Sequence, residues 1–354
     1  MHRATLTIDP ALTVAQVNPR LYGSFVEHMG RCVYTGIYEP GHPEADEDGL
    51  RRDVLDLIRE LGVTMIRYPG GNYLSTARWE DGVGPREQRK KRFDVAWRSI
   101  ETNEFGLDEF IRFARKAGVE PMMAVNLGTR GVEEALDLLV YANHPSGTYR
   151  SEQRAANGSP EPHDIRMWCL GNEMDGGWQP GHKTAHEYAR LAAETARVMK
   201  MYDPDLELVA CGSAHSAMPT FGSWESTVLE EAYEHVSHIS CHQYYAETPD
   251  DLASFLAGGV DLESLIEGVV ATADAVHAKG RHTKRINLSL DEWNVTFRTN
   301  EIFGDIEPWQ RSPRLIEDRY TATDAVVVGS MLIAMLRHAG FRDDSSFIPV
   351  TSWA

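Results

Sequence analysis

Two glutamates, each at the end of an apolar run, are the residues of this sequence best suited to paired chemistry. Glu173 ends the segment Arg166-Met-Trp-Cys-Leu-Gly-Asn-Glu173, and Glu292 lies in Ile286-Asn-Leu-Ser-Leu-Asp-Glu-Trp293. The apolar runs predict buried strands, and a carboxylate at the end of a buried strand is rarely left without a partner or a function. We therefore expect two strands that each deliver one carboxylate.

Two such carboxyls can cleave a glycosidic bond with retention of configuration. One is protonated and assists the leaving group, and the other attacks the anomeric carbon from about 5–5.5 Å away. Asn172 can bond a sugar hydroxyl beside the reacting carbon, and Trp293 offers an apolar wall that can stack on a sugar ring. Alternatively, Glu173 is an acidic residue in the first turn of a helix. For Asp291 we expect a structural hydrogen-bonding role.

Polar residues after a neighbouring predicted strand could support Glu292. His242 and Tyr244 lie in Ser240-Cys-His-Gln-Tyr-Tyr245. Hydrogen bonds from these two side chains would hold the carboxylate of Glu292 ionised and oriented. As an isolated motif, a histidine and a tyrosine satisfied within the core are the alternative.

Glu27 and Asn72 follow the first two predicted strands. Glu27 precedes His28, and Asn72 ends the segment Tyr68-Pro-Gly-Gly-Asn72. Either side chain could bind sugar hydroxyls, and the glycine pair fits a tight turn equally well.

The 14 histidines raise the alternative of metal chemistry. Metal-dependent barrel hydrolases usually carry His-x-His on the first strand, but this chain has Phe25-Val-Glu-His28 there. His235, His238 and His242 span a predicted helix end and a strand, so they would not share one face. We expect neither a metal nor another cofactor, and no Gly-x-Ser-x-Gly nucleophile motif is present.

Strands and helices are predicted to alternate along the chain, which indicates a parallel α/β fold. The predicted strands are residues 22–27, 64–68, 121–126, 165–170, 206–211, 238–243 and 286–290. The predicted helices are residues 50–61, 107–117, 132–143, 184–201, 226–235, 262–279 and 319–337. Polar residues collect after nearly every strand, and no Gly-x-Gly-x-x-Gly loop is present. That distribution favours a TIM barrel over a doubly wound sheet.

Two long insertions follow predicted strands on the presumed active face. Residues 78–102 and 297–313 are expected to be lids or subsite loops, or else disordered surface loops. Residues 5–8 alternate weakly and predict a short strand before the barrel.

Composition restricts the class of partner. The net charge of -18 argues against nucleic acids and anionic membranes, whose phosphates would be repelled. Four cysteines without C-x-x-C spacing suit reduced thiols, and the first residues lack an apolar signal core. We therefore expect a cytoplasmic, soluble protein.

From about residue 5 to 340 the sequence resembles the α-L-arabinofuranosidases of glycoside hydrolase family 51. The matching segments are Gly23-Ser-Phe-Val-Glu-His-Met-Gly-Arg31, Arg67-Tyr-Pro-Gly-Gly-Asn72, Trp168-Cys-Leu-Gly-Asn-Glu-Met-Asp-Gly176, Ser240-Cys-His-Gln-Tyr-Tyr245 and Asp291-Glu-Trp-Asn294.

The resemblance implies a retaining exo-enzyme that removes terminal α-L-arabinofuranosyl groups from arabinan, arabinoxylan or derived oligosaccharides. Glu173 matches the acid/base of the family and Glu292 its nucleophile. Glu27, Asn72 and Asn172 match sugar-binding positions, and His242 and Tyr244 match residues that support the nucleophile. The resemblance further implies a metal-free, often intracellular enzyme that assembles into hexamers or other homo-oligomers.

The chain departs from the family after about residue 340. We expect residues 1–20 to be an N-terminal strand segment that belongs to a β-sandwich in the family, residues 21–340 an incomplete catalytic barrel, and residues 341–354 a divergent tail. By this comparison the chain lacks barrel strand 8 and the C-terminal β-sandwich, as a truncated or frameshifted gene would. The alternatives to the arabinofuranosidase are an inactive remnant, a sugar-binding protein without turnover, or a barrel glycosidase of another linkage.

Overall fold

A closed barrel of parallel strands forms the centre of the computed structural model, which describes residues 3, 5–13, 15–248, 250–296, 304, 306–317, 319–339 and 348–352. Around the barrel the strands follow the order β1-β10-β9-β8-β7-β6-β5-β2. Their bounds are Gly23–Phe25 (β1), Met65–Tyr68 (β2), Glu120–Val125 (β5), Met167–Leu170 (β6), Glu207–Ala210 (β7), His238–Tyr245 (β8), Asn287–Val295 (β9) and Ile348–Ser352 (β10).

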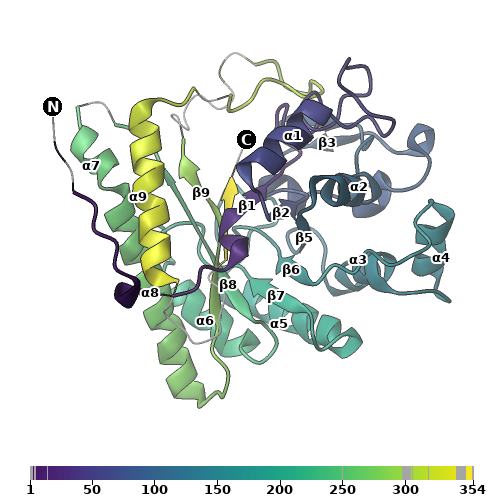
Figure 1. Cartoon of the computed structure of the whole chain (residues 1–354). Coiled ribbons are helices and arrows are strands. Elements are labelled where there is room, and N and C mark those ends of the chain that lie inside the picture. Colours follow the sequence, from purple (N-terminus) through teal and green to yellow (C-terminus); the bar gives the residue numbers. More distant parts are fainter. Residues whose placement is uncertain are drawn as a thin grey trace.

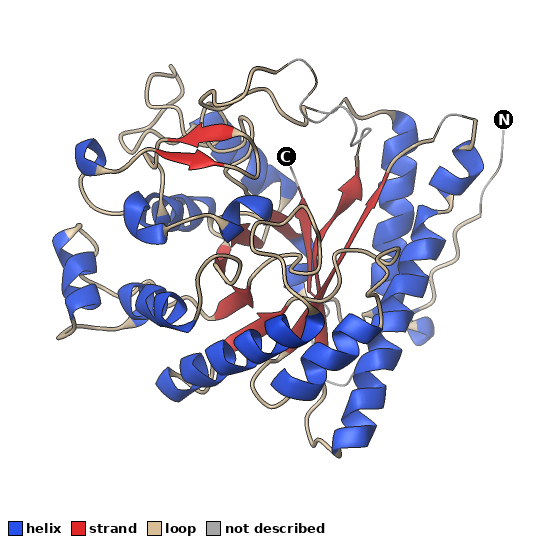
Figure 2. Cartoon of the chain, turned by 180° about the vertical axis from the view of Figure 1, so that it is seen from behind, coloured by secondary structure: helices blue, strands red, loops and turns tan. Residues whose placement is uncertain are grey.

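Helices surround the barrel on its outside (Figure 1; Figure 2). Their bounds are Arg52–Leu61 (α1), Leu107–Ala117 (α2), Val132–Asn143 (α3), Tyr149–Ala156 (α4), Ala185–Tyr202 (α5), Ser223–Ala232 (α6), Leu252–Leu256 (α7), Gly258–Gly280 (α8) and Ala322–His338 (α9). Short 3-10 turns cover Pro10–Leu12, Pro19–Tyr22, Asn72–Ser75, Trp79–Gly82 and Arg86–Gln88. The predicted TIM barrel is therefore confirmed. Of the described helices, α4 and α7 were not predicted.

Local sequence explains where several helices begin and end. α1 and α2 stop at Gly62 and Gly118, which adopt left-handed φ values of 75° and 77°. Thr184 caps α5 by accepting from the backbone N–H of Glu187.

Two apolar cores hold the barrel together. The larger lies between the sheet and the helices, and the smaller fills the barrel interior. The interior core consists of Phe25, Met65, Leu74, Met122, Ala124, Met167, Cys169 and Val209. At the N-terminal end of the barrel, Arg20 bonds Glu120 of β5 and Glu207 of β7, each at 2.8 Å.

The insertion between β2 and α2 is structured and partly buried. It contains a two-stranded antiparallel hairpin, Arg92–Asp94 (β3) and Ser99–Glu101 (β4). The backbone N–H of Ile100 donates to the carbonyl of Gln310 at 3.0 Å, so this hairpin pairs with the second insertion. Of that second insertion, residues 297–303 and 305 lie outside the described residues.

The expectation that barrel strand 8 is missing was wrong. β10, from the tail predicted to be divergent, occupies the eighth position and pairs in parallel with both β1 and β9. A seven-stranded array would leave two strand edges without backbone partners, and β10 satisfies both. The prediction rested on the tail's lack of family motifs, whereas pairing requires only a short extended segment. Among the described residues, β3 and β4 form the only sheet besides the barrel.

The weak strand predicted at residues 5–8 is not formed in this structure. Residues 5–9 have no regular secondary structure, and Leu6 and Ile8 are 85% and 82% exposed. Alternation alone cannot make a strand, because a strand needs a neighbouring edge to accept its backbone hydrogen bonds. The division of residues 1–20, 21–340 and 341–354 into domains stays a prediction.

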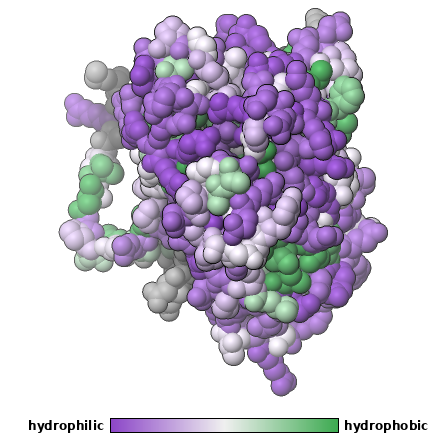
Figure 3. Space-filling model, turned by 90° about the vertical axis from the view of Figure 1, so that its right-hand side faces the viewer, coloured by the Kyte–Doolittle hydropathy of each residue, from purple (hydrophilic) through white to green (hydrophobic). Residues whose placement is uncertain are grey.

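One face of the molecule has a mainly polar surface (Figure 3). The face at the right of Figure 1 is mostly hydrophilic, with separate hydrophobic areas (Figure 3). The described helices include none with the length and apolar character needed to cross a membrane.

Candidate active site

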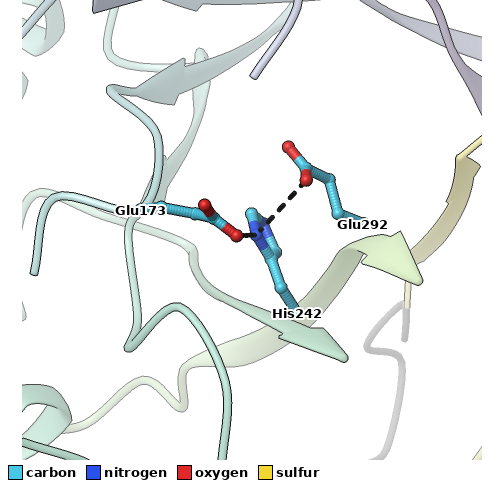
Figure 4. A group of neighbouring side chains, drawn as sticks. All are labelled: Glu173, His242 and Glu292. Atoms are coloured by element: carbon cyan, nitrogen blue, oxygen red, sulfur yellow. Dashed lines mark hydrogen bonds and ion pairs between the residues drawn. The ribbon is translucent and has the colours of Figure 1, made fainter. Parts of the chain in front are cut away.

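Glu173, His242 and Glu292 meet at the C-terminal end of the barrel (Figure 4). The imidazole lies between the two carboxylates, and one ligand atom from each residue lies within 4.8 Å of the others. All three residues are buried. The structure thus brings together the two glutamates that the sequence placed far apart.

Glu173 follows β6 on a loop. Its φ of 44° is left-handed, which is uncommon for a residue with a side chain and marks local backbone strain. No helix begins there, so the helix-start alternative was wrong. The indole N–H of Trp178, five residues later, donates to Oε2 of Glu173 at 2.8 Å.

Glu292 owes its position to a bulge in β9. Ser240 pairs with Ser289, but His242 pairs with Glu292, so β9 has one residue more than β8 between these two pairs. As a result Asp291 and Glu292 both reach the interior of the barrel, although consecutive strand residues normally face opposite sides. Asp291 accepts from Nε2 of His242 at 2.9 Å, which supports its predicted hydrogen-bonding role.

Arg67 of β2 joins the carboxylates to the neighbouring amide. Its guanidinium donates to Oε1 of Glu292 at 2.8 Å and to Oδ1 of Asn172 at 2.7 Å. It also lies 3.7 Å from Oδ2 of Asp291 and stacks over the ring of Phe25. This buried cation thus links Glu292, Asn172 and Asp291, with hydrogen bonds to the first two and an ion pair to the third.

Gly71 allows the loop after β2 to approach the carboxylate. A Cβ atom there would lie 2.6 Å from Oε1 of Glu292 and 3.3 Å from Nδ2 of Asn172. Asn72, the next residue, is half-buried and begins a 3-10 turn. Tyr244 donates its hydroxyl to Oε2 of Glu292 at 3.1 Å, as predicted.

Glu27 lies under the same loop and is held by two donors. Its Oε1 accepts from the backbone N–H of Tyr73 at 2.8 Å and from the indole N–H of Trp97 at 2.9 Å. Burial, and then the charge of Glu292, raise the pKa of Glu27 to about 8. The first insertion therefore contributes to the site through Trp97.

His242 is a buried imidazole among acidic groups. Burial alone would lower its pKa, but Glu292, Asp291 and Glu173 raise that pKa to about 10. Burial and the charge of Glu173 raise the pKa of Glu292 above its usual value, although His242 and Arg67 act to lower it. Burial also acts to raise the pKa of Asp291, but Arg67 and His242 bring it below the usual value.

Two features at the site differ from the sequence-based expectations. Nδ1 of His242 lies 3.0 Å from Glu173 and 3.7 Å from Glu292, so its hydrogen bond goes to the first carboxylate and not, as predicted, to the second. Trp293 is 2% exposed and packs in the core between sheet and helices, so it is no sugar-stacking wall. The bulge explains the second error, because it turns Glu292 inward and Trp293 outward.

Glu173, His242 and Glu292 lie close enough together to coordinate a cation. However, both imidazole nitrogens already contact carboxylates, so a metal would have to displace Glu173 or Asp291 from His242. A second acidic group, Asp46-Glu47-Asp48, surrounds the ammonium of Lys116 at 2.6–3.1 Å.

Comparison with known proteins places this barrel in a family. A family model described as "Alpha-L-arabinofuranosidase 1 domain" matches residues 57–255, and one for the "Alpha-L-arabinofuranosidase C-terminal domain" matches residues 291–341. An intracellular exo-α-(1→5)-L-arabinofuranosidase of Streptomyces lividans is 62% identical over 96% of this chain and 52% of its own length. The chain belongs to the α-L-arabinofuranosidases of glycoside hydrolase family 51.

Other members of family 51 resemble the chain in sequence and structure. An exo-α-(1→6)-L-arabinofuranosidase of Bifidobacterium longum is 54% identical over 96% of this chain and 67% of its own length. The structure of a family 51 arabinofuranosidase from the same species superposes with a TM-score of 0.91 at 52% identity, covering 96% of this chain and 67% of the other. The chain thus spans about half to two thirds of the length of these relatives.

Three residues of this family 51 site were absent from the sequence-based prediction. Arg67 was visible only as part of Arg67-Tyr-Pro-Gly-Gly-Asn72, and a charged residue inside an apolar strand was the signal that could have found it. Trp178 follows Gly176-Gly177 shortly after Glu173, which hinted at a loop that folds back. Trp97 had no local signal, because only the hairpin brings it to Glu27.

Proposed function

We propose that the chain is a retaining exo-acting α-L-arabinofuranosidase that hydrolyses terminal α-L-arabinofuranosyl groups by double displacement. The observation that carries the proposal is the close approach of two buried carboxylates, one on the loop after β6 and one in β9, with oxygen atoms within 4.8 Å. Retaining glycosidases hold their carboxyls about 5–5.5 Å apart, and inverting enzymes about 6.5–9.5 Å apart.

Glu292 is the proposed nucleophile. Arg67 and Tyr244 hold one oxygen each, which orients the carboxylate and, through the arginine, favours its ionised form. Attack on the anomeric carbon would form a glycosyl ester at Glu292, which water then hydrolyses.

Glu173 is the proposed acid and base. It would protonate the leaving oxygen in the first step and accept a proton from the attacking water in the second. Trp178 and His242 each hold one of its oxygens, which limits its rotation between these two steps.

Three further side chains are proposed to bind the arabinofuranosyl group. Nδ2 of Asn172 is buried and has no hydrogen-bond partner among the described residues, so a donor is available for a sugar hydroxyl. Glu27 and Asn72, on either side of the Gly70-Gly71 turn, are proposed to bond other hydroxyls. His242 supports the site through the two carboxylates that it contacts.

The proposed substrates are oligosaccharides of the arabinan or arabinoxylan type. Relatives of similar identity are named for α-(1→5) and for α-(1→6) linkages, so we propose both as candidates. We further propose that the protein is intracellular, as the name of the Streptomyces lividans relative says of that enzyme. A homo-oligomer that requires no metal or cofactor is proposed from the family resemblance alone.

The test combines a stereochemical assay with two variants. Proton NMR of early 4-nitrophenyl α-L-arabinofuranoside hydrolysis should show the α-anomer of arabinose first. Glu292→Ala should be inactive, whereas Glu173→Ala should retain turnover of this aryl substrate, because a good leaving group needs little acid assistance. Glu230→Ala on the surface of α6 serves as control. Equal loss in both site variants, or the β-anomer as first product, would refute the proposal.

A further inference from the structure

His242 is held at both of its nitrogens by carboxylates from different strands. Nε2 lies 2.9 Å from Oδ1 of Asp291, and Nδ1 lies 3.0 Å from Oε1 of Glu173. Asp291 and His242 are 1% and 2% exposed, so water does not compete for these contacts. The bulge in β9 is what allows Asp291 to reach the imidazole while Glu292 remains at the mouth.

The contact with Asp291 determines which nitrogen carries a hydrogen. An ionised carboxylate only accepts, so Nε2 must be protonated. Nδ1 then has two options. It donates to an ionised Glu173, or it accepts a hydrogen from a protonated Glu173. In both cases one proton is held between Nδ1 and Oε1.

We propose that Asp291 is a positioning residue that retains this proton between His242 and Glu173, and thereby supplies the acid of the first reaction step. The inference rests on the proposed function, because it assigns a source to the proton that Glu173 delivers. It extends that function to a residue outside the two catalytic carboxylates.

The proton count balances over the catalytic cycle. At the start the Nδ1–Oε1 pair holds one proton and Glu292 is ionised. When the bond from the anomeric carbon to the leaving oxygen breaks, that oxygen takes the proton from Glu173, and Glu292 forms the glycosyl ester. Attack of water then cleaves the ester, the water proton returns to the Nδ1–Oε1 pair, and Glu292 leaves as a carboxylate. Asp291 remains ionised throughout.

Other groups around His242 cannot replace Asp291. From β9, Glu292 approaches Nδ1 at 3.7 Å, but it loses its charge when the ester forms. From β2, Arg67 is a cation and opposes a second positive charge. From β6, the buried thiol of Cys169 contacts Asp291 itself at 3.6 Å. Asp291 is therefore the permanent negative charge on the imidazole.

Asp291→Asn tests the inference by its dependence on the leaving group. At pH 8 we expect turnover of a poor leaving group, methyl α-L-arabinofuranoside, to fall about 10²-fold. Turnover of 4-nitrophenyl α-L-arabinofuranoside should fall far less. Losing an opposite charge at this distance should lower, by roughly 1–3 pH units, the alkaline limb of the pH profile, which is the pH range in which turnover of methyl α-L-arabinofuranoside falls. The loss of activity relative to the wild type should therefore become smaller as the pH is lowered. Asp291→Glu keeps the negative charge and should return the alkaline limb of the pH profile to its wild-type position.

Asp175→Asn is the matched control. Asp175 lies on the loop after β6 and accepts from Ser213, Ala214 and Thr220, away from His242. Its loss should affect both substrates alike. Equal loss on both substrates in Asp291→Asn, without a shift of the limb, would overturn the inference and reduce Asp291 to a structural residue.

A measurement on the unmodified protein separates this inference from the proposed function. The nitrogen-15 NMR resonances of the His242 imidazole are assigned as those that are absent from the spectrum of His242→Gln. In the wild type, these resonances should show that Nε2 carries a hydrogen from pH 6 to pH 9. A deprotonated Nε2 would refute the inference even if the enzyme is active. If the wild type hydrolyses no arabinofuranoside, the proposed function fails, and the NMR result still decides how Asp291 acts on His242.

Discussion

Gly71→Ala should lower turnover without unfolding the barrel. The added Cβ would lie 2.6 Å from Oε1 of Glu292, whereas real Cβ contacts are essentially never shorter than 3.0 Å. One of the two groups must therefore move by at least about 0.4 Å (3.0 − 2.6). The carboxylate cannot move freely, because Arg67 holds the same oxygen at 2.8 Å and Tyr244 holds the other.

The expected loss follows from the sensitivity of enzymes to geometry. A displacement of 1 Å can cost about 10²-fold in rate, so 0.4 Å corresponds to roughly 5–10-fold in kcat. Alanine at this position should also cost about 1–3 kcal/mol of stability, because the φ of -96° and ψ of -93° at Gly71 lie outside the helix and strand regions, so turnover is measured well below the Tm of the variant.

The assay is steady-state hydrolysis of 4-nitrophenyl α-L-arabinofuranoside, together with thermal unfolding of each variant. Gly41→Ala is the matched control, since no atom of the part of the chain that the structure describes lies within 4 Å of the Cβ that it adds. Wild-type kcat in Gly71→Ala would refute the argument that this glycine makes room for Glu292. A loss of activity that only follows a large drop in Tm would refute it as well.

Two further predictions concern hydrogen bonds to carboxylates. Trp178→Phe removes the 2.8 Å hydrogen bond from the indole N–H to Glu173. Because the side chain of Trp178 is half-exposed and water can partly replace it, we expect kcat/KM to fall by only about 10-fold. Adding Trp178→Phe to Glu173→Ala should lower kcat/KM no further, because the hydrogen bond is already lost. Additive losses in the double variant would contradict the conclusion that Trp178 acts through Glu173. Arg20→Ala should lower the unfolding free energy at pH 7 by about 1–2 kcal/mol, discounted for partial exposure. Burial raises the pKa of Glu207 but its bonds to Arg20 lower it overall, so this stability is present above pH about 4.3 and is lost as the pH falls below it. A difference in urea midpoints that does not shrink between pH 7 and pH 3 would refute this reasoning.

Strand and helix positions were predictable because each element carries a local signal. The apolar run at Trp168-Cys-Leu170 and the left-handed stops at Gly62 and Gly118 are properties of a few neighbouring residues. β10 was missed because its pairing partners, β1 and β9, come from distant parts of the chain. The hairpin β3–β4 was missed because the composition of its insertion resembles that of a loop.

The identity of the two carboxylates was predictable, and their surroundings were not. Glu173 and Glu292 each end an apolar run, which is visible in one segment at a time. The contact of His242 with Glu173, and the partnership of Arg67 with both halves of the site, join residues from β2, β6, β8 and β9. No spacing in the sequence encodes such contacts, since they depend on how the strands are placed around the barrel.

The sequence by itself determined the alternation of strands and helices, the parallel barrel, the two glutamates at strand ends and the family resemblance. These follow from local apolar patterns and short motifs. Only the tertiary structure decided that β10 closes the barrel, that Trp293 faces the helices, and that Asp291 reaches His242. The physical reason is register. A single extra residue in β9 reverses which side chains face inward, and such a bulge exists only where two strands pair.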